Sequence, residues 1–179
     1  MKNKNLAFID IETTGLSPEK HEIIEIGIVI AKQQDGIVGD VLEEIELKIK
    51  PERIDEAEAE ALSINGYSEA GWLFAMSLEQ AMNVFAEKTK DCIMVAHNVS
   101  FDWSFLSRAF YTTGVENKMF YAKLDTISFA FAKFFNDKEI TKFNLGFLCE
   151  HYGIENNNAH TALSDARATY SLYRKMTEQ

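Results

Sequence analysis

The sequence predicts an α/β fold in which a mixed β-sheet is flanked by helices. Residues 6–50 contain three strand-like runs, and the rest of the chain combines helical runs with a further short strand-like run. Strands followed by β-α alternation are typical of a sheet packed between helices. The chain has 179 residues, of which 46% are hydrophobic, and no linker, repeat or low-complexity segment. One domain over residues 1–179 is therefore expected.

The first strand is predicted from Leu6 to Glu12, where side chains alternate with the period of two that a strand requires. Asp10 and Glu12 then project from the same face of the sheet. The next two runs are joined by a glycine-containing turn at 34–39, which favours an antiparallel meander. The further strands are predicted over residues 22–32, 40–50 and 92–96.

Helices are predicted from runs of helix-forming residues with recognisable start and stop signals. Ser77 and Gln80 form a capping-box pattern at one helix start, and Gly114 and Gly153 follow two other helices as closing residues. The segment 54–64 is included because it is rich in alanine and glutamate. The predicted helices span residues 54–64, 77–88, 101–113, 126–135, 145–152 and 161–176.

The composition restricts the class of protein. A net charge of −10 argues against the broad basic surface that neutralises many phosphates along a duplex. It suits an enzyme that grips only a strand end through cations held by acidic residues. The sequence has no apolar run of roughly 20 residues and no apolar secretory core at its N-terminus, so a soluble, cytoplasmic protein with no membrane contact is expected. Cys92 and Cys149 are expected to be buried free thiols.

Asp10 and Glu12 are the first candidate for a functional site. Two carboxylates two residues apart on a strand offer rigid oxygen ligands for Mg²⁺ or Mn²⁺. A solvated acidic face is the commoner reason for such a pair, and these two residues alone leave it open. Their position favours function, because they interrupt an apolar face and precede the turn Thr13-Thr14-Gly15, whose backbone amides could meet a phosphate.

Asp102 is the second candidate, at the end of the polar segment 97–102 that directly follows a predicted strand. Ligand sites of open α/β sheets lie outside the carboxyl ends of their strands. The competing interpretation is an ordinary first-turn aspartate, which the helix dipole favours. His97 in the same segment is interpreted as a hydrogen-bonded histidine that shapes the turn before Asp102, and not as a metal ligand.

The third candidate pairs His160 with Asp165 at the start of the last predicted helix. If both were helical, five positions would rotate them roughly 140° apart, so they converge only if His160 lies on the loop before the helix. A lone histidine there is more often a surface residue. The apolar stripe that follows is interpreted as core-facing and comprises Ala162, Leu163, Ala166, Tyr170 and Tyr173.

Together the three segments supply four carboxylates and one histidine, the set that two-metal phosphodiester hydrolysis requires. One cation would lower the pKa of a bound water, and a second, roughly 4 Å away, would stabilise the leaving oxygen. A histidine of near-neutral pKa is suited to take the proton of the attacking water. The sequence therefore predicts a site for two divalent cations, Mg²⁺ or Mn²⁺.

The three segments resemble the motifs of the DEDDh branch of the DnaQ-like 3′-to-5′ exonucleases, in the same order. The resemblance covers residues 6 to about 175 and implies the ribonuclease-H-like fold of that family, with a mixed five-stranded sheet flanked by helices. The residues that carry it are Phe8-Ile9-Asp10-Ile11-Glu12-Thr13-Thr14-Gly15-Leu16, then His97-Asn98 with Phe101-Asp102, and finally His160 with Asp165-Ala166.

The resemblance also implies a role for each catalytic residue. Asp10, Glu12 and Asp165 would hold the first cation, and Asp10 would also serve the second. Asp102 would support the second cation largely through waters, and His160 would be the general base.

The substrate in this resemblance is the 3′-terminal nucleotide of a strand. Thr13 and Thr14 would meet it by hydrogen bonding, while Leu16 would wedge against its base. The second motif adds the remaining residues of the predicted substrate pocket, which are His97, Asn98 and Phe101.

Segments at 124–126 and 148–154 resemble bacterial DNA polymerase III epsilon-type proofreading exonucleases, which favours single-stranded DNA over RNA as substrate and nucleoside monophosphates as products. Asp125 is assigned to capping the helix that follows it. Two alternatives stay open: an RNA-trimming enzyme similar to ribonuclease T or oligoribonuclease, and an inactive module that binds nucleic-acid ends. Association with a DNA polymerase is also left open.

Overall fold

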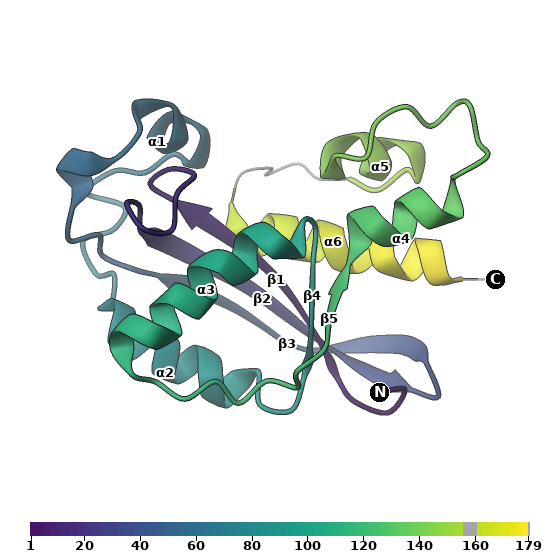
Figure 1. The fold of residues 1–179 in the computed structure, drawn as a ribbon, viewed down its shortest axis with the longest axis horizontal. Helices are drawn as coiled ribbons and strands as arrows, with labels where there is room; N and C mark the ends of the chain where they lie inside the picture. The colour runs from purple at the N-terminus through teal and green to yellow at the C-terminus, as the bar shows by residue number, and fades with distance from the viewer. Residues whose placement is uncertain (156–160, 179) are drawn as a thin grey trace.

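A five-stranded mixed sheet forms the centre of the protein, in the order β3-β2-β1-β4-β5 (Figure 1). The computed structural model describes residues 1–155 and 161–178. Within these ranges helices pack on both faces of the sheet, as the two hydrophobic cores show. The predicted α/β fold with a mixed sheet and flanking helices is confirmed.

The strands predicted from the sequence are all present, with ends that differ by a few residues. β1 pairs antiparallel with β2 and parallel with β4, and β2 and β3 form the predicted meander. The sequence pattern does not reveal β5, because three residues are too few to show a period of two. The strands are β1 (Leu6–Thr13), β2 (Ile23–Gln34), β3 (Ile37–Lys48), β4 (Ile93–Ala96) and β5 (Lys123–Asp125).

Helix boundaries follow the predicted capping signals closely. Ser77 and Gln80 form the expected capping box, and Gly114 closes its helix in the left-handed conformation. The helices are α1 (Ala59–Asn65), α2 (Leu78–Lys88), α3 (Val99–Thr113), α4 (Thr126–Lys133), α5 (Leu145–His151) and α6 (Ala162–Thr177), with a 3-10 turn η1 (Ile54–Glu56) before α1. None of these helices is long and apolar enough to cross a membrane.

The prediction of one continuous helix over 54–64 is wrong. The chain forms η1 and then α1, with Ala57 in an extended conformation between them. The N–H of Glu58 donates to the carbonyl of Thr14 at 2.8 Å, whereas in a continuous helix it would bond within the segment. A tertiary hydrogen bond to the turn after β1 therefore interrupts the helix that the local composition favours.

Alternation along β1 sends its side chains into two separate cores. Ala7, Ile9 and Ile11 are buried on the face covered by α2 and α3. Leu6 and Phe8 are buried on the opposite face, where the predicted core stripe of α6 packs through Ala166, Leu163, Tyr170 and Tyr173. Because side chains alternate, Asp10 and Glu12 continue this second face toward the carboxyl end of the strand.

Cys92 and Cys149 are buried and free, as predicted. Burial raises the pKa of both thiols to about 11, so neither provides a reactive thiolate at neutral pH.

Candidate active site

Three carboxylates from two elements meet on the face of the sheet that α6 covers. Asp10 and Glu12 come from β1, and Asp165 comes from the first turn of α6. One oxygen from each lies within 4.8 Å of the others. Oxygens that share one Mg²⁺ are up to about 4 Å apart, since each lies about 2.1 Å from the ion. The donor set and its spacing therefore suit a divalent cation.

The electrostatics of this cluster favour cation binding. Burial, followed by the nearby charges of Asp102 and Asp165, holds the pKa of Asp10 well above its usual range. Burial and then Asp165 and Glu25 raise the pKa of Glu12 to about 7. Like charges held together out of water disfavour one another's ionisation, and a bound cation would relieve the repulsion.

Asp102 lies next to the cluster, in the first turn of α3. It is almost fully buried, and it is not one of the three residues whose oxygens gather within 4.8 Å. Burial raises its pKa to about 8, although backbone N–H groups of Ile11 and of Asp102 itself oppose the rise. Its charge helps to raise the pKa of Asp10, and the charge of Glu12 helps to raise its own, so Asp102 belongs to the same acidic environment.

His160, the predicted general base, lies outside the described residues. Its predicted partner Asp165 is placed by α6, whose N-cap is Thr161. The role of His160 therefore stays a prediction.

His97 is a hydrogen-bonded loop histidine, as the sequence interpretation has it. Its Nδ1 lies 2.8 Å from the Thr126 hydroxyl, and its Nε2 lies 2.9 Å from the Phe143 carbonyl. Burial lowers the pKa of His97, which favours the neutral ring. With both nitrogens engaged inside the protein, His97 holds the segment before Asp102 and is not placed to accept a proton from water.

The remaining residues of the second motif shape the start of α3. Asn98 adopts the left-handed conformation with φ 75°, and it sets the helix start at Val99, earlier than the predicted Phe101. Phe101 is half-buried and packs against Phe105, with ring centroids 5.2 Å apart. Their contact with substrate stays a prediction.

Asp125 acts as a helix cap, as its assignment from the sequence has it. Its Oδ1 accepts a hydrogen bond from the N–H of Ser128 in α4 at 3.0 Å. Its Oδ2 accepts a second from the N–H of Val99 in α3 at 2.8 Å. One carboxylate thus joins the starts of two helices, and it is not among the carboxylates whose oxygens gather within 4.8 Å in the described residues.

The turn after β1 is fixed by its own hydrogen bonds. The N–H of Thr14 donates to the Glu22 carbonyl, and the Thr14 hydroxyl accepts from the N–H of Glu22. The Thr13 hydroxyl donates to the carbonyl of Gly15 at 2.8 Å. Thr13 and Thr14 therefore build the turn, and the expectation that its amides face a phosphate does not hold at Thr14. Their contact with substrate stays a prediction.

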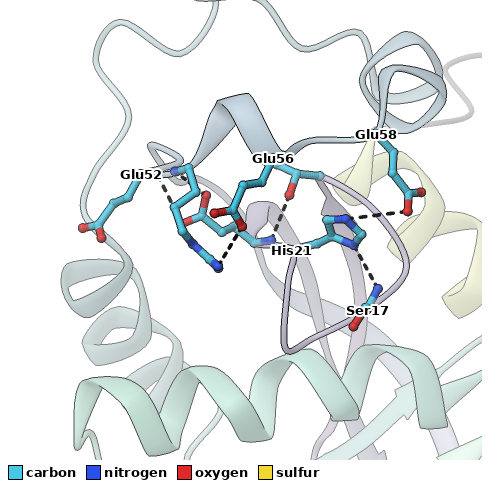
Figure 2. Close-up of polar contacts among 8 residues, drawn as sticks. Ser17, His21, Glu52, Glu56 and Glu58 are labelled. Atoms are coloured by element: carbon cyan, nitrogen blue, oxygen red, sulfur yellow. Dashed lines mark hydrogen bonds and ion pairs between the residues drawn. The ribbon is translucent and has the colours of Figure 1, made fainter.

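Leu16 stands at the tip of this turn and is 74% exposed, the position that a wedge against a base requires. His21 supports the turn from behind: its Nδ1 accepts from the N–H of Ser17, and its Nε2 lies 3.6 Å from Glu58 (Figure 2). The ring of His21 also fills the space that a side chain at Gly15 would need. Leu16 is therefore exposed on a turn whose conformation is held by the contacts of His21.

A hollow of about 490 Å³ lies beside the His21 side of this turn, between the turn, α2 and α3. The clustered carboxylates do not line it, so it is separate from the candidate metal site. Arg53 at its rim is already paired with Glu22 and Glu56.

Two residues that the sequence interpretation missed place α6 against the sheet. Glu25 on β2 is buried, and its Oε1 accepts a hydrogen bond from the N–H of Ala162 at 2.9 Å. A Cβ at Gly27 would lie only 2.1 Å from the carbonyl carbon of Ala162. The available signal was that Glu25 and Gly27 interrupt an otherwise apolar strand.

Comparison with known proteins adds a family-level match. The sequence matches the exonuclease family over residues 7–173. It is 29% identical to DNA polymerase III PolC-type of Staphylococcus aureus and 30% identical to that of Staphylococcus saprophyticus, each over 180 residues. These alignments cover 100% of this chain but 12% of each relative, so the chain spans about an eighth of the length of the polymerases it matches.

Solved structures show the same fold. Exonuclease I from Methylocaldum szegediense superposes with a TM-score of 0.80 at 19% identity, over 98% of this chain and 41% of that one. Escherichia coli exonuclease I in complex with a dT13 oligonucleotide superposes with a TM-score of 0.77 at 18% identity, over 96% of this chain and 40% of that one. The likeness confirms the ribonuclease-H-like, exonuclease-type fold.

Proposed function

The chain belongs to the exonuclease family as a DnaQ-like 3′-to-5′ exonuclease, and we propose that it removes nucleoside monophosphates from the 3′ end of single-stranded DNA with two divalent cations. The observation that carries this proposal is the convergence of Asp10, Glu12 and Asp165 within 4.8 Å, beside the buried Asp102. Four carboxylates with no cation are an unfavourable arrangement for the fold alone. A metal-dependent function accounts for them.

In this proposal Asp10, Glu12 and Asp165 hold one Mg²⁺ or Mn²⁺, while Asp10 and Asp102 serve a second. Bound there, the cations would supply a water of lowered pKa and would stabilise the leaving oxygen. His160, the histidine of the third motif, takes the proton of the attacking water. His97 is excluded from that role by its two hydrogen bonds to Thr126 and Phe143.

The strand end meets the protein at the turn after β1. Leu16 is exposed there and offers an apolar contact to the last base without reading its identity. The net charge of −10 supports a small footprint, in which cations rather than side chains neutralise the phosphates. Single strands are favoured because a terminal base must be separated from its partner to reach such a contact.

DNA is proposed as the substrate because the curated relatives are named as DNA polymerases and the structural neighbours include complexes with DNA oligonucleotides. Because these relatives are DNA polymerases, we propose a role beside a DNA polymerase, in proofreading or repair, in the cytoplasm. The catalytic carboxylates do not distinguish the two sugars, because that depends on how a site treats the 2′-hydroxyl.

The proposal is tested with matched single-stranded DNA and RNA oligonucleotides labelled at the 5′ end. With Mg²⁺ we expect a ladder that shortens one nucleotide at a time from the 3′ end, faster on DNA than on RNA. A label at the 3′ end should leave at once as a mononucleotide. Faster RNA shortening would favour the trimming enzyme, and binding without shortening would favour an inactive end-binding module. Internal fragments would contradict exonuclease action, and immediate release of the 5′ label would contradict the 3′-to-5′ polarity.

A further inference from the structure

Glu25 adds a fifth carboxylate near the acidic cluster, although its oxygens are not among the three that gather within 4.8 Å. It lies directly opposite Glu12 in the β1–β2 ladder and is only 2% exposed. Like charges directly opposite one another destabilise a sheet, and a buried carboxylate needs a strong compensating contact. The hydrogen bond that Glu25 makes therefore explains why a carboxylate occupies this buried position.

That contact is with the start of α6. Glu25 Oε1 accepts the N–H of Ala162, the first residue of the helix, at 2.9 Å in a buried setting. A carboxylate from a neighbouring strand thus satisfies one of the backbone N–H groups that a helix start leaves without an intrahelical partner. Its negative charge also lies at the positive end of the helix dipole.

The same first turn carries Asp165. The N–H of Asp165 donates to the carbonyl of Thr161 at 3.1 Å, so the Asp165 carboxylate moves with the turn that Glu25 holds. Gly27, two residues along β2, allows the backbone of Ala162 to come close to the strand. Figure 1 shows α6 beginning near the end of β1.

We propose that Glu25 is a positioning residue of the metal site: by binding the Ala162 N–H it holds the first turn of α6, and so holds Asp165 against Asp10 and Glu12. The bond, and not the charge, carries this role. Glu25 itself does not bind the cation. The inference rests on the proposed function for the identity of the site, but the contact itself is made between two protein groups.

Two conservative variants separate the bond from the charge. Glu25→Gln removes the charge and keeps an acceptor oxygen at the same distance from the backbone. Glu25→Asp keeps the charge and withdraws the oxygen by one methylene, about 1.5 Å. Glu46→Gln is the matched control, because Glu46 is an exposed carboxylate that acts electrostatically on Glu25 from β3.

Three measurements on these variants test the proposal. The first is hydrogen exchange of the Ala162 amide in EDTA, which reports the bond itself. The second is titration of the substrate-free protein with Mn²⁺, and the third is kcat and KM on a short single-stranded DNA. Supporting partners of metal ligands typically contribute 10- to 100-fold to metal affinity. Glu25→Asp should therefore lose amide protection and at least about tenfold in Mn²⁺ affinity, and kcat should fall more than KM changes.

Glu25→Gln and Glu46→Gln should both keep a protected Ala162 amide and an Mn²⁺ affinity within about threefold of wild type, far from the tenfold range of a lost supporting contact. If Glu25→Gln loses amide protection or Mn²⁺ affinity, the proposal is overturned, because the charge of Glu25 and not its hydrogen bond is then required. This result does not depend on whether Glu25→Asp folds stably. Wild-type behaviour of Glu25→Asp overturns it as well. If the wild type does not shorten DNA but the amide and Mn²⁺ results follow the expected order, the inference stands and the proposed function fails.

Discussion

Replacing Glu12 with glutamine should stabilise the metal-free protein at alkaline pH while abolishing its activity. The pKa of Glu12 is raised from 4.5 to about 7, first by burial and then by Asp165 and Glu25. A carboxyl with a raised pKa holds its proton more tightly in the folded state than in the unfolded chain. Its contribution to stability is therefore fully present below pH 4.5 and is lost as the pH rises through about 7.

The size of the effect follows from the difference between the two pKa values. The shift from 4.5 to about 7 is about 2.5 pKa units, and one unit corresponds to about 1.4 kcal/mol, so the ionisation of Glu12 destabilises the fold by at most roughly 3–4 kcal/mol above pH 7. Solvent at the partly exposed carboxylate reduces this figure. In a chain of this length 1 kcal/mol shifts the melting temperature by roughly 2–4 °C, so Glu12→Gln should melt up to about 10 °C higher at pH 8 in EDTA.

Thermal unfolding in EDTA at pH 4 and pH 8 measures the effect, and a second series with Mg²⁺ supplies the cation. The advantage of Glu12→Gln should vanish at pH 4, where both side chains are neutral, and should shrink when Mg²⁺ stabilises the wild type. Glu44→Gln is a control of opposite sign, because Arg167 lowers the pKa of Glu44. Equal melting temperatures of Glu12→Gln and wild type at pH 8 in EDTA would refute the reasoning.

Three further predictions concern catalysis. Asp10→Ala and Asp165→Ala should each nearly abolish hydrolysis and weaken Mn²⁺ binding yet remain folded, as circular dichroism would show; unfolding of both would favour a structural role. His160→Ala should lower kcat roughly 10²- to 10⁴-fold with little change in KM and should flatten the acidic limb of the pH–rate profile, whereas His97→Ala should retain that limb. Leu16→Ala should mainly raise KM for single-stranded DNA. Binding of single-stranded DNA by the wild type should weaken only modestly with salt, because few side chains neutralise phosphates; a steep salt dependence would reveal an extended basic track.

The fold was largely readable from the sequence because its elements carry strong local signals. The alternation in β1 and the capping box at Ser77 predict those elements with nearly correct ends. The exceptions are places where tertiary contacts outweigh local preference. Glu58 bonds to the turn at Thr14 and so interrupts a helix, and β5 forms only because β4 provides a neighbour for its three residues.

The sequence predicted the carboxylates that cluster at the candidate site, but not the residues that support them. Asp10 and Glu12 are related by strand geometry, and an ordered set of motifs indicates Asp102 and Asp165. By contrast, nothing in a linear sequence states that Glu25 reaches Ala162, because 137 positions separate them and the contact exists only once α6 lies on β2. Such a residue is visible beforehand only as a polar interruption of an apolar strand.

The supports matter because the buried carboxylates repel one another. Each element that carries one of these carboxylates is anchored by contacts between protein groups. β1 is held by ladders on both sides, α3 by its buried apolar face, and α6 by Glu25 and the close approach at Gly27. The repulsion within the acidic cluster is therefore opposed by contacts between protein groups. In the function that we propose, these contacts would hold the carboxylates close to their metal-bound positions, which would keep the entropic cost of binding a cation low.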